Sequence, residues 1–246
     1  MAVPLIQFND VKKSFNDVAV LNGINLSVFR GEITAVIGKS GTGKSVLLKH
    51  IIGLIAPDSG QILIEGEPLS TLSRHKKKRF QKRLSYMFQD NALFDFMDIY
   101  HNISLPLAED SEFPNALIRD RVIQLTEQLG VSDALEKYPA QLSGGMRKRV
   151  ALARALVTDP EIVLFDEPTT GLDPVRKKNV HKMITEHQEE FGFTAVIVSH
   201  DIPEIFNIAQ RIAMLDNGAI QFEGSKKELL NAQHAALNAF VNGEEL

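Results

Sequence analysis

The segment GKSGTGKS, residues 38–45, lies between the apolar run ITAVI and the longer apolar segment VLLKHIIGL. This order predicts a strand, a glycine-rich turn and a helix. Glycine lets the turn curl so that backbone N–H groups converge on an anion at the positive end of the helix. The spacing matches G-x-x-x-x-G-K-[ST], whose physical role is to cradle the phosphates of a nucleoside triphosphate. The segment therefore predicts an α/β fold with a phosphate-binding loop.

Each residue type in this loop has an expected role. Lys44 would hold the β- and γ-phosphates as a point charge, and Ser45 would give its hydroxyl to Mg²⁺. The remaining expected nucleotide-binding positions in the segment are Gly38, Ser40, Gly41, Gly43 and Val46.

Other short apolar runs predict the rest of a largely parallel sheet. They are RLSYMF, EIVLFDE and TAVIVSH, separated by longer amphipathic segments. Asn217-Gly218 between two apolar runs predicts a small antiparallel hairpin, and SKKE at residues 225–228 matches a capping box that opens a last helix. We expect one domain over residues 1–246. Residues 1–88 and 161–224 would form its core, 89–160 an inserted helical subdomain and 225–246 a helical tail.

Composition excludes several classes of protein. The chain has 246 residues, 27 Lys and Arg against 31 Asp and Glu, a formal charge of −4 and no cysteine. These values argue against a nucleic-acid partner and against a disulfide scaffold. The start does not resemble a secretory signal, and no apolar run approaches the roughly 18 residues of a membrane helix. We expect a soluble chain whose membrane role would require a partner.

Two carboxylates follow the apolar run IVLF. Asp166 and Glu167 would lie at the carboxyl edge of the sheet, where α/β proteins bind ligands. Asp166 would bind Mg²⁺ directly or through water, and Glu167 would polarise the attacking water.

Further motifs make the chain resemble an ATP-binding cassette (ABC) ATPase. LSGGM at residues 142–146 is followed by LFDEPTTGLD and then by SHD. The resemblance implies that Gln89 is the Q-loop glutamine, which also reaches the metal, and that Asp173 ends the D-loop. It also implies that His200 is the switch histidine and that Phe15 stacks on adenine. Together with Lys44 and Glu167, His200 would form the catalytic group.

The resemblance also implies how ATP is held. Ser143, Gly144 and Gly145 at a helix start offer a second anion site. In the family, two copies form a head-to-tail homodimer that sandwiches ATP and Mg²⁺ between the Lys44 loop of one chain and Ser143 of the other.

The segment LSGGM, which matches the signature motif of the family, departs from the usual family sequence at Met146, where Gln is common. Methionine there is similar to the importer-type branch that powers bacterial phospholipid and sterol transporters, and the ending NAFVNGEEL resembles that branch's final helix. The resemblance implies ATP-driven lipid transport at the cytoplasmic side of the inner membrane, with a separate permease and an MCE-domain lipid-binding protein as partners. The resemblance further implies that Leu93, Phe94, Phe96 and Met97 help to form a cleft that receives a coupling helix of the permease; equally, these four residues would pack the subdomain core.

Other functions stay open at this point. Another small-molecule cargo would use the same motor, whereas a non-transport ABC ATPase would be expected to carry a coiled-coil insertion or two cassettes. A nucleotide-gated scaffold would bind ATP and hardly hydrolyse it. The basic run at residues 74–83 favours a solvated helix face, with contact to lipid headgroups as the alternative.

Overall fold

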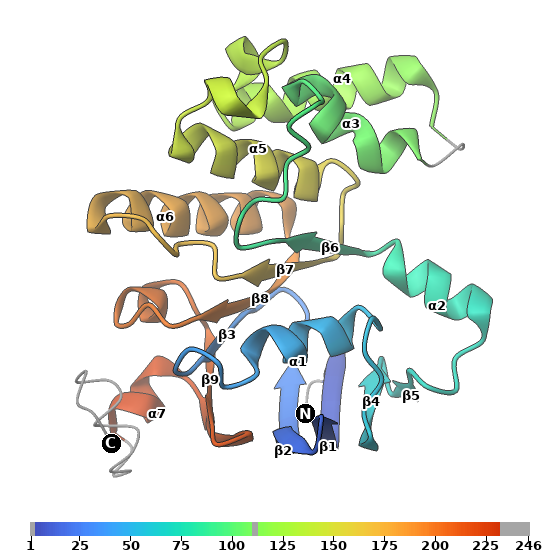
Figure 1. Cartoon of the computed structure of the whole chain (residues 1–246), viewed down its shortest axis with the longest axis vertical. Helices are drawn as coiled ribbons and strands as arrows, with labels where there is room; N and C mark the ends of the chain where they lie inside the picture. Colours follow the sequence, from blue (N-terminus) through green and yellow to red (C-terminus); the bar gives the residue numbers. More distant parts are fainter. Residues whose placement is uncertain (1–2, 110–112, 232–246) are drawn as a thin grey trace.

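The computed structural model describes residues 3–109 and 113–231, and a six-stranded sheet forms its centre (Figure 1). The strand order is β10-β9-β3-β8-β7-β6, with every neighbouring pair parallel except the β9–β10 hairpin. The strands are β3 (Ile33–Ile37), β6 (Leu84–Met87), β7 (Ile162–Asp166), β8 (Thr194–Ser199), β9 (Arg211–Asp216) and β10 (Ala219–Gly224). The predicted α/β fold, its four parallel strands and the hairpin at Asn217-Gly218 are confirmed.

A second, antiparallel sheet precedes most of the first along the chain, in the order β2-β1-β4-β5. Its strands are β1 (Ile6–Phe15), β2 (Val18–Val28), β4 (Ser59–Ile64) and β5 (Glu67–Pro68). The sequence reading did not identify these strands individually. Polar residues interrupt the alternation of β1, and its pairing with β2 shifts register after Phe8, Val11 and Lys13.

Helices cover the central sheet on both faces. They are α1 (Lys44–Ile51), α2 (Arg74–Gln81), α3 (Ile99–Ala108), α4 (Asn115–Gln128), α5 (Gly144–Leu156), α6 (Pro174–Phe191) and α7 (Lys226–Asn231). Short 3₁₀ turns lie at Ser132–Ala134, Pro139–Gln141 and Glu204–Asn207. Helices α3, α4 and α5 gather at one end of the molecule (Figure 1) and belong to the segment for which the sequence predicts an inserted helical unit.

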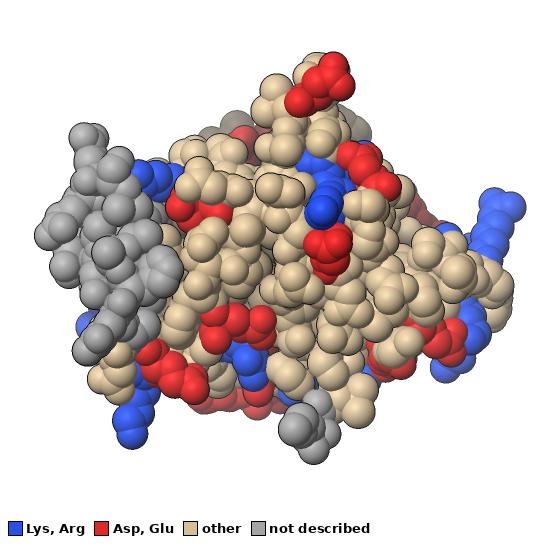
Figure 2. All heavy atoms as spheres, turned by 90° about the horizontal axis from the view of Figure 1, so that it is seen from below, with Lys and Arg blue, Asp and Glu red and all other residues tan. Residues whose placement is uncertain are grey.

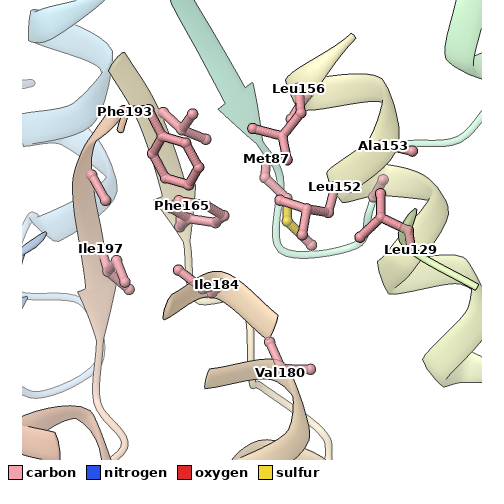
Figure 3. Close-up of a cluster of buried hydrophobic side chains, with 14 of the residues drawn as sticks. Met87, Leu129, Leu152, Ala153, Leu156, Phe165, Val180, Ile184, Phe193 and Ile197 are labelled. Atoms are coloured by element: carbon pink, nitrogen blue, oxygen red, sulfur yellow. The ribbon is translucent and has the colours of Figure 1, made fainter. Parts of the chain in front are cut away.

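The core has two layers because successive residues of a strand face opposite sides of the sheet. Val163, Phe165 and Ile197 face α5 and α6, while Leu164 and Val198 face α1 and the antiparallel sheet. Figure 3 shows the first layer, in which Phe165 and Phe193 lie with ring centroids 6.4 Å apart beside Ile184 of α6. Strands buried on both faces read as continuous apolar runs, which explains why they were predictable.

Ser225 opens α7 as predicted, since its backbone N–H and hydroxyl each lie 2.7 Å from the Glu228 carboxylate. The rest of the predicted tail, including NAFVNGEEL, lies outside the described residues. No helix within the described ranges is both long enough and apolar enough to cross a membrane.

Candidate functional site

The glycine-rich loop joins β3 to α1 and requires glycine for two different reasons. Gly43, at the start of α1, has φ = 100°, and a Cβ there would lie 2.9 Å from the Val20 side chain. A Cβ on Gly38 would lie 2.3 Å from the Leu215 carbonyl oxygen. Gly41 has open space around it but φ = 79°, which side chains other than glycine rarely adopt.

Lys44 turns back into this loop. Its buried Nζ donates to the carbonyl oxygens of Gly38 at 2.9 Å and Lys39 at 2.8 Å, and lies 3.6 Å from Glu167 Oε1. Burial lowers the pKa of Lys44, although Glu167 and Asp166 act in the opposite direction. A cation is thus held at the start of α1, whose first turn contains no acidic residue to cancel the positive helix end.

Ser45 and Asp166 meet across the sheet edge. The Ser45 hydroxyl donates to Asp166 Oδ1 at 2.8 Å, and Tyr86 of β6 donates its hydroxyl to Oδ2 at 2.7 Å. Burial, with the hydrogen bond to Asp166, raises the pKa of Tyr86, so the phenol stays protonated. A hydroxyl beside a carboxylate is a donor set that suits Mg²⁺, which binds through one or two carboxylates together with substrate phosphates.

Glu167 follows β7 in a left-handed backbone conformation with φ = 48°. Its Oε2 accepts from the Thr170 hydroxyl at 2.8 Å and lies 3.1 Å from His200 Nδ1. Burial raises the pKa of Glu167, but these hydrogen bonds and the charges of His200 and Lys44 outweigh burial, and the pKa is lowered. Glu167 is therefore a carboxylate at neutral pH, aimed between the lysine and the histidine.

A neighbouring network, which the sequence reading missed, connects the loop after β8 to α6. Buried Asp201 accepts hydrogen bonds from the Thr169 hydroxyl and Lys177 Nζ. Its own N–H donates to the Ser199 hydroxyl at 2.9 Å. Burial raises the pKa of Asp201, but its hydrogen bonds with Lys177 and Thr169 lower the pKa by more than burial raises it. The net shift of the pKa is therefore downward. The available signal was position: Thr169 and Asp201 lie within LFDEPTTGLD and SHD, the two motifs that carry Glu167 and His200.

Phe15 is the last residue of β1. It pairs with Val18 across the β1–β2 turn, its ring is 41% exposed and Lys13 Nζ lies 5.5 Å from the ring centroid. Val18 and the exposed Ser40 line a hollow of about 710 Å³ in front of the glycine-rich loop. Val46 packs its side chain against the core.

The signature residues lie elsewhere. Ser143 caps α5 by accepting from the Met146 N–H at 3.2 Å. Ser143 and Gly145 line a second hollow of about 510 Å³ with Leu172 of the D-loop, and no residue lines both hollows. Met146 packs against the helical core instead of making the side-chain hydrogen bond that glutamine would offer. Gly144, the first residue of α5, and Gly145 leave the helix start uncovered.

Asp173 stands beside this second hollow. It caps α6 by accepting from the Arg176 N–H at 3.0 Å, and its carboxylate lies 3.2 Å from Arg176 Nε. Within the described part of the chain, the structure thus brings Lys44, Ser45, Asp166, Glu167 and His200 together and leaves Ser143 and Asp173 at a different surface.

Gln89 lies exposed in the turn after β6, with no contact to Ser45 or Asp166 among the interactions of the described residues. Beside it, Tyr86, Phe88, Phe94, Pro106 and Arg154 contribute to a cleft of about 300 Å³.

The four apolar residues predicted for this region divide between the two expected roles. Leu93 packs against the core and Met97 is half-buried, whereas Phe94 is 41% exposed and Phe96 is 75% exposed. The exposed pair leaves apolar surface at the mouth of the cleft.

Comparison with known proteins agrees with this geometry. Residues 21–170 match the family model described as ABC transporter. The chain is 38% identical over 239 residues to the intermembrane phospholipid transport system ATP-binding protein MlaF of Escherichia coli K12. The aligned region covers 97% of this chain and 89% of that protein. Its identity to the Haemophilus influenzae protein of the same name is 35%, covering 98% of this chain and 91% of that protein.

The chain is also similar to ATP-binding proteins of two other transport systems. The methionine import ATP-binding protein MetN of Brucella abortus is 38% identical over 223 residues, 91% of this chain but 60% of that protein. The solved structure of CbiO1 from Clostridium perfringens, described as part of the ABC transporter complex cbiONQ, superposes with a TM-score of 0.84 and 30% identity. The superposition covers 96% of this chain and 94% of that one.

Proposed function

Because the chain belongs to the ABC transporter family of ATP-binding, ATP-hydrolysing proteins, we propose that it is the ATPase subunit of a bacterial phospholipid transporter. The observation that carries this proposal is the similarity to MlaF proteins over nearly the whole of both chains. The equal identity to MetN supports import of another small molecule as the second candidate, although that similarity covers only 60% of the MetN chain.

We assign the chemistry of hydrolysis to the residues that meet at the sheet edge. Lys44 and the N–H groups of the glycine-rich loop bind the phosphates, and Phe15 supports the adenine. Ser45 and Asp166, joined by Gln89 from the turn after β6, would hold Mg²⁺, and the ion would neutralise phosphate charge. Glu167 takes a proton from the attacking water, since its lowered pKa keeps it ionised. His200, 3.1 Å from Glu167, orients the water and the γ-phosphate.

We further propose that the site is completed by a second copy. Ser143 and Gly145, at the start of α5, line a hollow separate from that of the glycine-rich loop, and a helix start of this kind suits an anion. A head-to-tail homodimer would bring Ser143 of one copy to the phosphates held by the other, with Asp173 shaping the junction. ATP then favours the closed dimer because both copies bind its γ-phosphate, and hydrolysis removes that advantage.

The exposed aromatic residues at the helical end support the partner assignment. Phe94 and Phe96 leave apolar surface at the mouth of the cleft near Gln89, which suits an apolar segment of an integral membrane permease. The same segment, residues 89–160, carries Ser143, so a movement of the permease would reach the second half of the ATP site. We place the chain on the cytoplasmic side of the inner membrane, bound to the permease, in a complex that includes an MCE-domain lipid-binding protein.

The test is affinity capture of the tagged chain from detergent-solubilised membranes of its native host, followed by protein and lipid mass spectrometry. Recovery of a polytopic permease with an MCE-domain protein and phospholipid is the expected result. A permease recovered with a methionine-binding protein would favour the second candidate. Recovery of ribosomal or DNA-repair proteins in place of any permease would contradict transport altogether.

A further inference from the structure

Helix α2 (Arg74–Gln81) is a cationic surface that the ATP site does not use. Its sequence, RHKKKRFQ, contains no acidic residue, and Lys82 and Arg83 follow directly. The helix projects from the right-hand side of the molecule in Figure 1, and Lys and Arg side chains reach furthest out on the same side in Figure 2.

Only part of this charge is neutralised within the chain. Lys76 lies 2.6 Å from the Glu67 carboxylate, and Arg83 contacts Glu65 at 2.8 Å and Glu161 at 2.6 Å. The side chains of Arg74, His75, Lys78 and Arg79 are exposed and have no hydrogen bond or ion pair with any described residue. These four side chains, defined here as the α2 cationic surface, are free to meet an external anion.

The arrangement is unfavourable for the helix by itself. Arg74 and Lys78 are four residues apart, and like charges at this spacing repel. Basic residues also fill the first turn, where the helix dipole favours acidic ones. Tertiary anchors hold the helix: Phe80 is buried, and Gln81 Nε2 donates to the Ile52 carbonyl oxygen at 3.1 Å. A merely solvated face would be more stable with mixed signs, whereas an anionic ligand relieves the repulsion.

The position of α2 suggests the ligand. Phe88 lies six positions after Lys82 in the sequence, so α2 ends within about 20 Å of the cleft assigned above to the permease. Leu54, two residues after the Ile52 carbonyl that binds Gln81, is 69% exposed, so an apolar side chain lies at the surface near the end of α2. Lysine-rich clusters next to a membrane attachment bind anionic headgroups, with about 1 kcal/mol for each Lys or Arg close to the surface.

We infer that the α2 cationic surface binds the anionic phospholipid headgroups of the membrane in which the permease sits. This inference rests on the proposed function in one respect, since that function is what places the chain at a membrane. The surface adds a second attachment, independent of ATP, that orients the chain beside the permease. A net charge of −4 gives the chain no general attraction to such a membrane, so the binding must be local to α2.

The test is co-sedimentation of the full chain with vesicles of phosphatidylglycerol and phosphatidylcholine in equal parts, at low ionic strength. The variant Lys78→Gln with Arg79→Gln keeps good helix formers and removes two charges. Its vesicle affinity should fall roughly 30-fold, which is the loss of about 2 kcal/mol. The matched control, Lys178→Gln with Lys227→Gln, changes the charge equally at exposed positions elsewhere and should bind within about twofold of the unaltered chain.

Binding should also be absent with phosphatidylcholine alone and should weaken as salt is raised. Equal loss in both variants, or no loss in either, would overturn the inference. So would an α2 variant that binds vesicles normally but no longer co-purifies with the permease, because α2 would then contact protein. ATP hydrolysis in solution is measured in parallel: unchanged rates in both variants show intact folding, and a chain that binds vesicles but never hydrolyses ATP would contradict the proposed function alone.

Discussion

Glu167 is fixed by three neighbours that also determine its charge. Thr170 and His200 contact one carboxylate oxygen, and Lys44 lies 3.6 Å from the other. The Glu167→Gln variant keeps the shape of this group and removes its ability to accept a proton. Hydrolysis should fall roughly 10²- to 10⁴-fold, while ATP binding persists and an ATP-bound dimer accumulates.

Single-turnover hydrolysis and size-exclusion chromatography with ATP measure these two effects. Glu167→Asp serves as a control, since it retains a base but shortens its reach and should leave measurable activity. Undiminished hydrolysis by Glu167→Gln would show that another group accepts the proton.

The contribution of Asp201 to stability should depend on pH. Its folded pKa lies below the ordinary value of 3.8, so it stabilises the fold above that pH and loses the contribution as pH falls through the folded pKa. Asp201→Asn should lower the free energy of unfolding by about 2 kcal/mol at pH 7, because Lys177 and Thr169 lose a charged partner. The difference between variant and unaltered chain in urea unfolding should shrink below about pH 4, and a difference that is constant with pH would refute this assignment.

At the scale of elements, two helix starts allow a matched comparison. Ser143 caps α5 and Ser73 caps α2, with hydroxyl to N–H distances of 3.2 and 3.3 Å. Replacement of either by alanine should cost about 1 kcal/mol of stability. Only Ser143→Ala should also weaken ATP-dependent dimerisation, measured by analytical ultracentrifugation in the Glu167→Gln background. An equal effect of Ser73→Ala would mean that dimerisation responds to general loss of stability.

The elements differ in how far the sequence predicts them. Strands β3, β7 and β8 are buried along their whole length, so their composition alone identifies them. Strand β1 mixes polar and apolar residues, and its partner β4 lies far along the chain, so the antiparallel sheet depends on contacts that no local pattern encodes. The motif residues of the candidate site were identified from spacing. Tyr86 and Asp201 were not, because their hydrogen bonds to Asp166 and Thr169 link different strands and loops.

At the scale of the whole molecule, the exposed aromatic residues should decide attachment to the permease. Phe94→Ser with Phe96→Ser should abolish co-purification with the permease and leave ATP-dependent dimerisation unchanged, because both rings are exposed and neither lines the two hollows of the ATP site. Leu117→Ser, at a position on α4 that is 52% exposed, is the control and should co-purify normally. Retention of the permease by the double variant would exclude this surface as the docking site.

The central claim is that two copies, arranged head to tail, complete each ATP site. The chain has no cysteine, so single cysteines can be introduced without background reactivity. Ser40→Cys marks the glycine-rich loop and Ser143→Cys marks the signature, each in the Glu167→Gln background. We predict that a short bismaleimide cross-links the two variants when they are mixed with ATP and does not cross-link either variant with itself. Cross-linking of Ser40→Cys chains to one another, or equal cross-linking without ATP, would contradict the account.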